Sequence, residues 1–418
     1  MRCLLLAASV CAAQETLTLA DAEATALKNH PRIASLALQA KAAAEAVTQA
    51  KAPLYPVMSV NLTGVGAERG SAVAAGNITT SSLASRAAGG MVLNQLITDF
   101  GRTGFLATSA QLRAGAKEKD VAVSRAQVLL RVRQTYYRAL AGEAVLKIAR
   151  ETVEARKVTL RLVTALANSN LKSTLDVSFA EVAVSEADLA LYRAENDAKA
   201  SRAELAAAMG LQEEKAFALR DEPLPVTLEL PAEEWTARGI KERPELAALQ
   251  LQRDAAARFA DAEKRLRLPS LYALGVAGAI PAREEKLKGT YAAAGLNLSI
   301  PIFNGSLYSS RQKEASFKAL AAEKDVRELE VSIARSIRIA YLNARTGERR
   351  MDVTARLIEQ AARALKLAQS RYELGLSSIV ELTQAQLSKT GADIENAAAR
   401  YEYQIQRAQL DFEAGAVQ

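Results

Sequence analysis

Residues 90–101 read GMVLNQLITDFG, and residues 295–306 read GLNLSIPIFNGS. The two segments correspond position by position at an offset of about 205 residues, and the same offset continues far beyond them without a gap. Corresponding pairs are Gly90 with Gly295, Leu93 with Leu298, Asp99 with Asn304, Tyr136 with Tyr341, Asp176 with Glu381, Val177 with Leu382 and Gly210 with Gly415. The chain is therefore a tandem duplication, in which the second half repeats the first.

The offset is larger upstream of these segments. It is about 213 residues where Pro31 corresponds to Pro244 and Pro56 to Pro269. The difference of about eight residues must lie in the Gly- and Ser-containing stretch 66–85 of the first half. We expect the longer of two hairpin loops there.

The N-terminus has the pattern of an export signal. A basic start at Arg2 precedes the apolar stretch 3–10, and small residues follow at 11–13. Both cysteines, Cys3 and Cys11, lie in this segment, so the mature chain would hold no disulfide and no cysteine-bound metal. Two alternatives stay open: a lipid on Cys11, or an ordinary hydrophobic N-terminus.

The composition favours long helices that pack closely. Half of the 418 residues are hydrophobic, but only 5% are aromatic, and alanine dominates the apolar set. No run of eighteen apolar residues follows the signal, so any membrane crossing would have to use strands. The net charge is +7, but acidic residues are interleaved with basic ones, which argues against a nucleic-acid surface.

Proline placement marks two tracts in which uninterrupted helices can run. No proline lies between Pro56 and Pro223 or after Pro301, and apolar residues in both tracts recur every three or four positions. We expect one long helix in each tract, at about 101–168 and 305–372, each about 100 Å long. Helices of that length need partners. The expected partners are shorter helices at 20–52, 175–209, 240–266 and 379–414.

Four segments are expected to be strands. Apolar and polar residues alternate around Met58, Val60 and Leu62, and again around Leu296 and Leu298. The expected strands lie at about 57–66, 86–97, 270–280 and 290–301. About ten residues is the length of a tilted transmembrane strand. The alternative, two soluble hairpins, would leave apolar edges unpaired.

Each long helix is expected to end in a tight tip, at 168–174 and 373–378. Gly375 readily adopts the left-handed conformation that closes a helix, and Asn170 is the next most tolerant residue. These tips would point away from the strands.

Four strands are too few to close a membrane barrel, because the smallest single-chain barrels use about eight. An open sheet in lipid leaves its edge groups unsatisfied, at a cost of several kcal/mol for each. We therefore expect several copies to close one barrel together, with the helices continuing it as a tube. A wide barrel of this kind is a channel.

The order of elements and several local motifs resemble the TolC family of outer-membrane efflux proteins across the whole mature chain. The matching motifs are LTLA at 17–20, NHP at 29–31, DFGR at 99–102, PIFNG at 301–305 and LGL at 374–376. The resemblance implies a mainly α fold with a small β part, organised as a signal peptide (1–13), repeat 1 (14–210), a mixed equatorial segment (211–236) and repeat 2 (237–418).

The same resemblance implies how the protein assembles. Three copies would form a homotrimer with a twelve-stranded barrel in outer-membrane lipid and a periplasmic α-barrel of helical hairpins. The tips would dock a periplasmic adaptor protein, which connects them to an inner-membrane transporter. By position, the docking candidates are Asn170, Leu171, Leu374, Gly375, Leu376 and Ser377.

Two features depart from the family pattern. The first tip has Asn170 where glycine is common, so docking there would be weaker or differently shaped. Many members narrow the periplasmic entrance with acidic rings, but here Arg363, Lys366 and Arg371 occupy the turns before the second tip. A basic constriction would favour anions if these residues face the lumen.

Other classes of protein are less well supported. His30 is the only histidine and precedes a proline, so we assign it a structural role and predict neither an enzyme nor a metal or cofactor site. An exported coiled-coil scaffold or adaptor without a membrane barrel is the main alternative. The four strand segments argue against it. The cargo, the cognate pump and adaptor, and the resting state of the channel cannot be read from the sequence.

Overall fold

The structure of the protein is a computed structural model. It describes residues 16–66, 74–75, 78–79, 86–212, 217–224, 228, 230–282 and 289–417. The expected signal peptide, most of the longer hairpin loop at 66–85 and parts of the mixed segment at 211–236 lie outside the described residues.

The chain forms two compact units, and both halves of the duplication contribute to each of them. Unit 1 comprises Met1–Leu36, Val121–Pro244 and Glu330–Gln418, whereas unit 2 comprises Ala37–Asp120 and Glu245–Leu329. The expected mainly α fold with a small β part is confirmed.

The helices of the two halves match in length. The described α-helices are α1 (Leu19–Asn29), α2 (Pro31–Lys51), α3 (Arg102–Asn168), α4 (Thr174–Ala208), α5 (Ala232–Glu242), α6 (Pro244–Lys264), α7 (Leu307–Glu373) and α8 (Ile379–Glu413). Short 3-10 turns, η1 (Ala52–Leu54) and η2 (Arg265–Arg267), follow α2 and α6. Both α3 and α7 have 67 residues, and both α4 and α8 have 35. The duplication is thus visible as two copies of one helical pattern.

Proline divides the shorter helical stretches. α1 ends before Pro31 and α5 ends before Pro244, where His30 and Arg243 have extended backbones with ψ of 119° and 120°. The reason is that proline lacks an N–H group and disfavours a helical residue before it. The stretches expected as helices at 20–52 and 240–266 are therefore each interrupted by a proline.

The first helix of the second half begins ahead of residue 237, the expected start of repeat 2. α5 starts at Ala232, directly after Pro231, and carries Glu233 and Glu234 in its first turn. Acidic residues are favourable there because they complement the positive end of the helix dipole.

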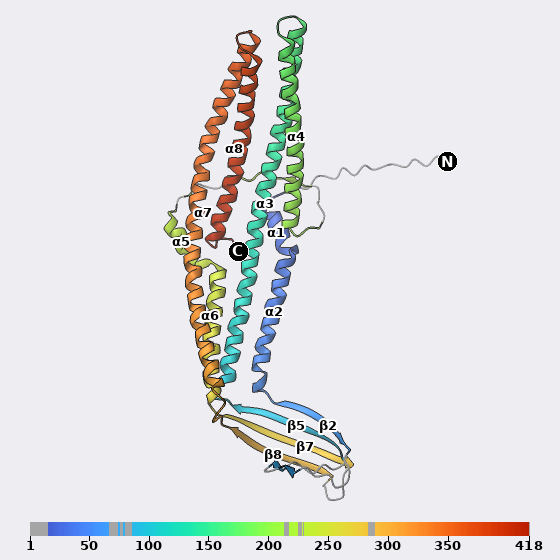
Figure 1. Cartoon of the computed structure of the whole chain (residues 1–418), viewed down its shortest axis with the longest axis vertical. Coiled ribbons are helices and arrows are strands. Elements are labelled where there is room, and N and C mark those ends of the chain that lie inside the picture. The colour runs from blue at the N-terminus through green and yellow to red at the C-terminus, as the bar shows by residue number, and fades with distance from the viewer. Residues whose placement is uncertain are drawn as a thin grey trace, which may run out of the picture. The chain divides into compact units, whose positions relative to one another are not determined.

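Unit 2 contains an open antiparallel sheet in the order β2-β5-β7-β8 (Figure 1). Its strands are β2 (Val57–Val65), β5 (Arg86–Thr98), β7 (Ser270–Ala282) and β8 (Thr290–Ser299). Each half supplies one hairpin, and the β5–β7 pairing joins the two halves, with Val92 opposite Val276. Among the described residues, β2 and β8 form the two edges of this sheet. The short strands β3 (Ala74–Ala75) and β4 (Ile78–Thr79) form a separate antiparallel pair in the same unit. None of the described helices combines the length and the apolar character that crossing a membrane would require.

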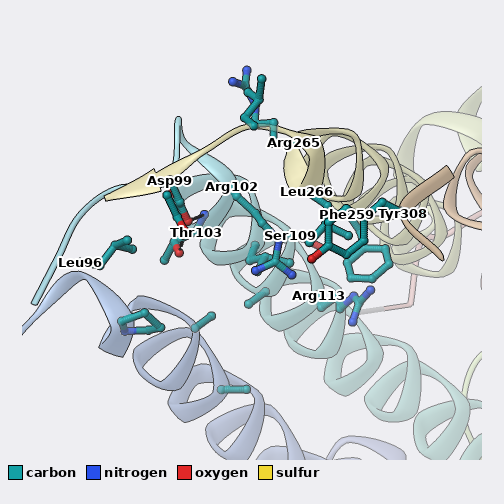
Figure 2. Close-up of a pocket in the computed structure, with 18 of the residues that line it drawn as sticks. Leu96, Asp99, Arg102, Thr103, Ser109, Arg113, Phe259, Arg265, Leu266 and Tyr308 are labelled. Carbon is teal, nitrogen blue, oxygen red and sulfur yellow. Dashed lines mark hydrogen bonds between the residues drawn. The ribbon is translucent and has the colours of Figure 1, made fainter. Parts of the chain in front are cut away.

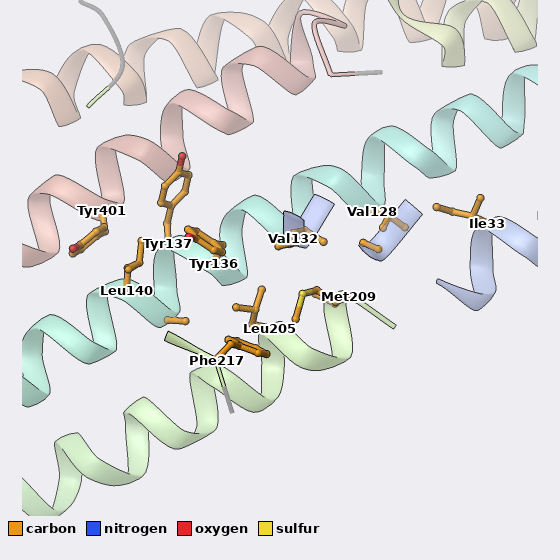
Figure 3. Close-up of a cluster of buried hydrophobic side chains, with 14 residues drawn as sticks. Ile33, Val128, Val132, Tyr136, Tyr137, Leu140, Leu205, Met209, Phe217 and Tyr401 are labelled. Carbon is orange, nitrogen blue, oxygen red and sulfur yellow. The ribbon is translucent and has the colours of Figure 1, made fainter. Parts of the chain in front are cut away.

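A cluster of aromatic and aliphatic side chains forms a core of unit 1 (Figure 3). Tyr136 on α3 is fully buried, and its ring meets Tyr137 edge-on at 6.0 Å and 84°. The Tyr136 hydroxyl lies 2.8 Å from the carbonyl oxygen of Leu17 and 2.7 Å from that of Arg220. These carbonyls lie at the short parallel pair of β1 (Thr16–Leu17) and β6 (Ala218–Leu219). One tyrosine therefore anchors described parts of the mixed segment and the N-terminal strand to the long helix.

Candidate functional site: the helical tips

Both helical hairpins close with the same backbone geometry. In the first tip, the N–H groups of Asn170 and Leu171 donate to the carbonyls of Ala167 and Leu166. In the second tip, Gly375 and Leu376 donate in the same way to Tyr372 and Arg371. Asn170 has φ of 55° and Gly375 has φ of 77°, so both occupy the left-handed position that ends a helix. Asn170 in the first half therefore occupies the position that Gly375 occupies in the second half.

A serine begins the return helix at each tip. The Ser173 hydroxyl accepts a hydrogen bond from the Leu175 N–H at 3.1 Å, and the Ser378 hydroxyl accepts one from the Glu381 N–H at 3.3 Å. These caps satisfy N–H groups that have no partner within the helix. The local sequence thus determines both the tight turn at each tip and the start of the helix that follows it.

The tips expose large apolar side chains. Leu171, Leu374 and Leu376 are 69%, 74% and 66% exposed. Exposed leucines that cluster at a turn are typical of a surface that contacts another protein. Ser377 differs from the other docking candidates, because its hydroxyl is buried and has no hydrogen-bond partner among the described residues.

The two tips contact each other. The Lys172 ammonium nitrogen lies 4.3 Å from the centroid of the Tyr372 ring, within the range of a cation–π interaction. Tyr372 is fully buried in a cluster with Val163, Ile379 and Leu382. Burial, with a smaller contribution from the Asp176 charge, raises the pKa of the Tyr372 hydroxyl. The tips therefore form one apolar end of unit 1 rather than two independent turns.

Two of the three basic residues expected near the entrance have carboxylate partners. Arg363 forms an ion pair with Glu359 one turn earlier on α7. Arg371 lies 3.2 Å from the Glu381 carboxylate and donates to the Leu376 carbonyl at 3.4 Å. Lys366 is exposed and has no salt-bridge partner among the described residues. The positive charge of this region therefore rests mainly on Lys366.

Sequence reasoning missed a buried polar link between α3 and α8. Arg156 donates to the side-chain oxygen of Gln386, whose amide nitrogen donates to the Thr159 hydroxyl at 2.9 Å. Arg156 is 7% exposed, and burial lowers the pKa of its guanidinium group. The signal in the sequence is an arginine among the small and apolar residues Ala149, Val153 and Val163 that form the buried face of α3.

Sequence reasoning also missed Glu263, near the end of α6 in unit 2. Its carboxylate is 2% exposed and accepts hydrogen bonds from Arg311 on α7 at 2.7 and 3.0 Å. Arg102 at the start of α3 lies 3.7 Å away. One buried acid thus ties together the first turns of both long helices.

A cavity of about 1050 Å³ lies in unit 2, between α2, α3, α6 and the start of β7 (Figure 2). Asp99 at its edge caps α3 by accepting hydrogen bonds from the Thr103 N–H at 2.7 Å and the Thr103 hydroxyl at 2.5 Å. Arg265 lies over the Phe105 ring at 4.6 Å and donates to the Phe100 carbonyl at 2.6 Å. Several polar groups of the cavity are therefore engaged in holding the start of α3. In the described part of the chain, no cluster of His, Cys, Asp and Glu side chains has the grouping that a metal ion would require.

Comparison with known proteins gives consistent matches. The family profile described as Outer membrane efflux protein matches residues 24–211 and 237–416. The Outer membrane protein TolC of Vibrio cholerae is 24% identical over 407 residues, an alignment that covers 94% of this chain and 89% of that protein. The alignment with TolC of Escherichia coli is 25% identical over 111 residues, so there the chain matches only 22% of the relative's length.

Solved structures agree in fold. A membrane protein from Pseudomonas aeruginosa has a TM-score of 0.83 at 21% identity, with 95% of this chain and 93% of that chain covered. The CmeC outer membrane channel of Campylobacter jejuni has a TM-score of 0.80 at 17% identity, covering 95% and 85%. The open state of the Neisseria gonorrhoeae MtrE outer membrane channel has a TM-score of 0.78 at 17% identity, covering 95% and 88%.

Proposed function

Because this chain belongs to the outer membrane efflux protein family, we propose that three copies form the exit duct of a tripartite efflux or secretion system. The duct lies in the outer membrane and has a large helical portion in the periplasm. The duct supplies no energy for transport and has no catalytic activity of its own. Substrates reach the duct from an inner-membrane transporter through a periplasmic adaptor protein.

The open sheet of unit 2 is the observation that carries this proposal. Its four strands have 9 to 13 residues, which is enough for each to cross a membrane at a tilt. Both edge strands expose large apolar side chains, with Val60 and Leu62 on β2 at 71% and 84% and Leu296 on β8 at 72%. Three copies would bring the strand count to about twelve and would remove every open edge.

The same sheet disfavours an exported scaffold without a barrel. Such a protein would leave the apolar rows of β2 and β8 in water and their backbone groups without a partner. In a closed barrel that lies in lipid, the apolar side chains of β2 and β8 contact lipid and the backbone groups of both strands pair with neighbouring strands.

The tips are the proposed docking surface for the adaptor. The support for this is the set of three exposed leucines, Leu171, Leu374 and Leu376, at one apolar end of unit 1. Asn170 and Gly375 contribute the turns that present them. We expect the second tip to contribute more of the contact with the adaptor, since Leu374 and Leu376 lie on either side of Gly375.

The basic turn of α7 is the proposed entrance constriction. Arg363 and Arg371 have carboxylate partners, whereas Lys366 has none among the described residues, so Lys366 would contribute most of any preference for anions.

Two experiments test the proposed function. Membrane fractionation should release the protein only with detergent, as an oligomer of three times the chain mass; release by salt alone would overturn the proposal.

The second experiment compares Leu374→Asp with Leu374→Met in cells that depend on this duct. Leu374→Asp should abolish efflux while the oligomer persists, and Leu374→Met should retain efflux. Full efflux by Leu374→Asp would remove the tip from the docking surface.

A further inference from the structure

The cavity of unit 2 has two ends of different chemical character. The end next to the sheet is lined mainly by leucine and proline side chains, among them Leu96, Leu106 and Leu266. The other end, farther along α3, is lined by Arg113, Lys117 and Gln252. Binding sites for small molecules combine apolar walls with a few polar groups that fix the orientation of the ligand. The order of apolar and cationic walls here matches a ligand with an apolar body and one negative end.

The residues that α3 contributes to the cavity follow one face of the helix (Figure 2). They recur every three or four positions, at Arg102, Leu106, Ser109, Arg113 and Lys117. The 11 positions from Arg102 to Arg113 correspond to about 16 Å along the helix. On the α2 side, the wall consists of the small residues Ala43, Ala46 and Ala50. The cavity is therefore elongated, with space for an apolar chain beside α3.

The polar groups at the sheet end already have partners within the protein. The Asp99 carboxylate caps α3, and it is the only acidic side chain among the described residues that line the cavity. Arg102 lies 3.7 Å from the buried Glu263 carboxylate, and Arg265 donates to the Phe100 carbonyl at 2.6 Å. These groups are occupied in holding the start of α3.

The cations at the other end lack comparable partners. Arg113 has no salt-bridge partner and donates no hydrogen bond among the described residues; its guanidinium carbon lies 5.6 Å from the centroid of the Phe259 ring. Lys117 lies 3.0 Å from Asp120, in a pair whose side chains are 44% and 27% exposed. Such a partly exposed pair is weak and leaves the ammonium group available to a second anion. A guanidinium group without an acceptor binds carboxylate or sulfate oxygens strongly.

The second half of the chain does not repeat this arrangement. At the offset of about 205 residues, Lys318 on α7 corresponds to Arg113, and Glu314 corresponds to Ser109. Lys318 pairs with Glu314 at 2.6 Å, so the cation of the second half is neutralised on its own helix. The shared helical pattern therefore forms without an uncompensated cation at this position, and the charge of Arg113 belongs to the cavity.

We propose that this cavity binds a single-chain anionic amphiphile of the fatty-acid type. The carboxylate of the ligand accepts hydrogen bonds from Arg113 and Lys117, and its aliphatic chain runs along Leu106 and Ala50 toward the sheet. The volume of about 1050 Å³ is at the upper end of the range of about 300–1,000 Å³ that holds small ligands, which favours one chain over a two-chain lipid. All of these residues lie in unit 2 of one copy, so the inference does not rest on the proposed duct.

Fluorescence of a bound probe tests the site in the full-length protein, reconstituted in phosphatidylcholine nanodiscs. The probe is dansyl-undecanoate, whose emission strengthens and shifts to shorter wavelength in apolar surroundings, and protein-free discs give the background. We expect saturable binding that laurate displaces. Lauryl alcohol has the same chain without the charge and should compete about tenfold more weakly.

Variants at the two ends of the cavity locate the charge. Arg113→Gln should weaken probe binding about tenfold, whereas Arg113→Lys keeps the charge and should stay within about threefold of the unmodified protein. The matched control is Lys318→Gln, which removes the cation at the equivalent position of α7 and should change the affinity less than about twofold. Ala50→Phe fills the apolar end without a change in charge and should weaken binding about tenfold or more.

Several results would overturn the proposal. These are unchanged affinity in Arg113→Gln, equal competition by laurate and lauryl alcohol, and a larger loss in Arg102→Gln than in Arg113→Gln, which would place the charge at the sheet end. Adding phosphatidylglycerol to the discs should leave binding unchanged after correction with protein-free discs. Saturable competition by that lipid would identify a two-chain lipid as the occupant. Release of the protein from membranes by salt alone would overturn the proposed duct but not this site.

Discussion

Replacing Glu263 by glutamine tests how the two long helices are held where they leave the sheet. The carboxylate is 2% exposed, receives two hydrogen bonds from Arg311 at 2.7 and 3.0 Å, and lies 3.7 Å from Arg102. Glutamine has almost the same shape but no charge and only one acceptor oxygen. The variant therefore leaves two guanidinium groups beside a neutral buried amide.

The expected cost follows from burial. Removing one partner of a fully buried ion pair costs about 3–5 kcal/mol. Here the Arg311 and Arg102 side chains are 43% and 30% exposed, so water can solvate them in part when the carboxylate charge is lost. We therefore expect a loss of about 2 kcal/mol in local stability, which corresponds to about 30-fold faster opening.

Hydrogen–deuterium exchange on the native oligomer measures this quantity, because it reports local opening without requiring reversible unfolding. Amides of α6 around Glu263 and of the first turns of α3 and α7 should exchange about 30-fold faster in Glu263→Gln. Amides of unit 1 should be unchanged. The matched control is Asp261→Asn on the same helix, whose pair with Arg258 is exposed and should contribute less than about 0.5 kcal/mol.

Two results would refute this reasoning. One is an exchange rate in Glu263→Gln within about threefold of the unmodified protein, since burial would then add nothing to the ion pair. The other is an amide exchange rate in Asp261→Asn that rises as much as in Glu263→Gln. The effect would then come from losing any negative charge on α6 rather than from the buried ion pair.

Three further changes have defined outcomes. Tyr136→Phe removes the hydroxyl that holds two carbonyls of the mixed segment and the N-terminal strand, and should cost about 1 kcal/mol, measured as faster amide exchange in those segments. Gly239→Ala places a methyl group against the Ile337 side chain of α7 and 3.1 Å from a backbone oxygen, and should lower the stability of unit 1 by about 1–3 kcal/mol. At Gly391 an added Cβ would meet no atom within 4 Å apart from its chain neighbours and the backbone of its own helix, so Gly391→Ala should instead stabilise that helix; equal losses in thermal melting would contradict the steric argument. Arg363→Glu with Lys366→Glu should shift single-channel selectivity toward cations, and unchanged reversal potentials would show that these residues do not face the pore.

Most of the helical architecture could be predicted because its signals are local. α3 runs over Arg102–Asn168, where a helix at about 101–168 was expected, and α4 over Thr174–Ala208, where one at 175–209 was expected. Proline, glycine and the apolar repeat act within a few residues of where they stand, so the sequence displays them directly. The start of α5 at Ala232 is not evident in the sequence, because the pattern indicates a helix there only from Ile240 onward.

The tips were predictable as turns but not as a joined end. Asn170 and Gly375 mark two helix ends in the sequence, and both adopt the left-handed conformation. Nothing local indicates that Lys172 lies over the Tyr372 ring, since this contact joins the two halves of the duplication. The same holds for the link from Arg156 to Gln386.

The sequence by itself indicated the duplication, the two long helices, the turns that end them and the four strand segments. Only the tertiary structure decided which charges are buried, which are paired and which remain exposed. Glu263 and Glu359 are both helix acids in the sequence, but packing buries the first between two arginines and leaves the second exposed. The physical reason is range: helix and turn propensity act between neighbours, whereas desolvation and pairing depend on side chains brought together from distant parts of the chain.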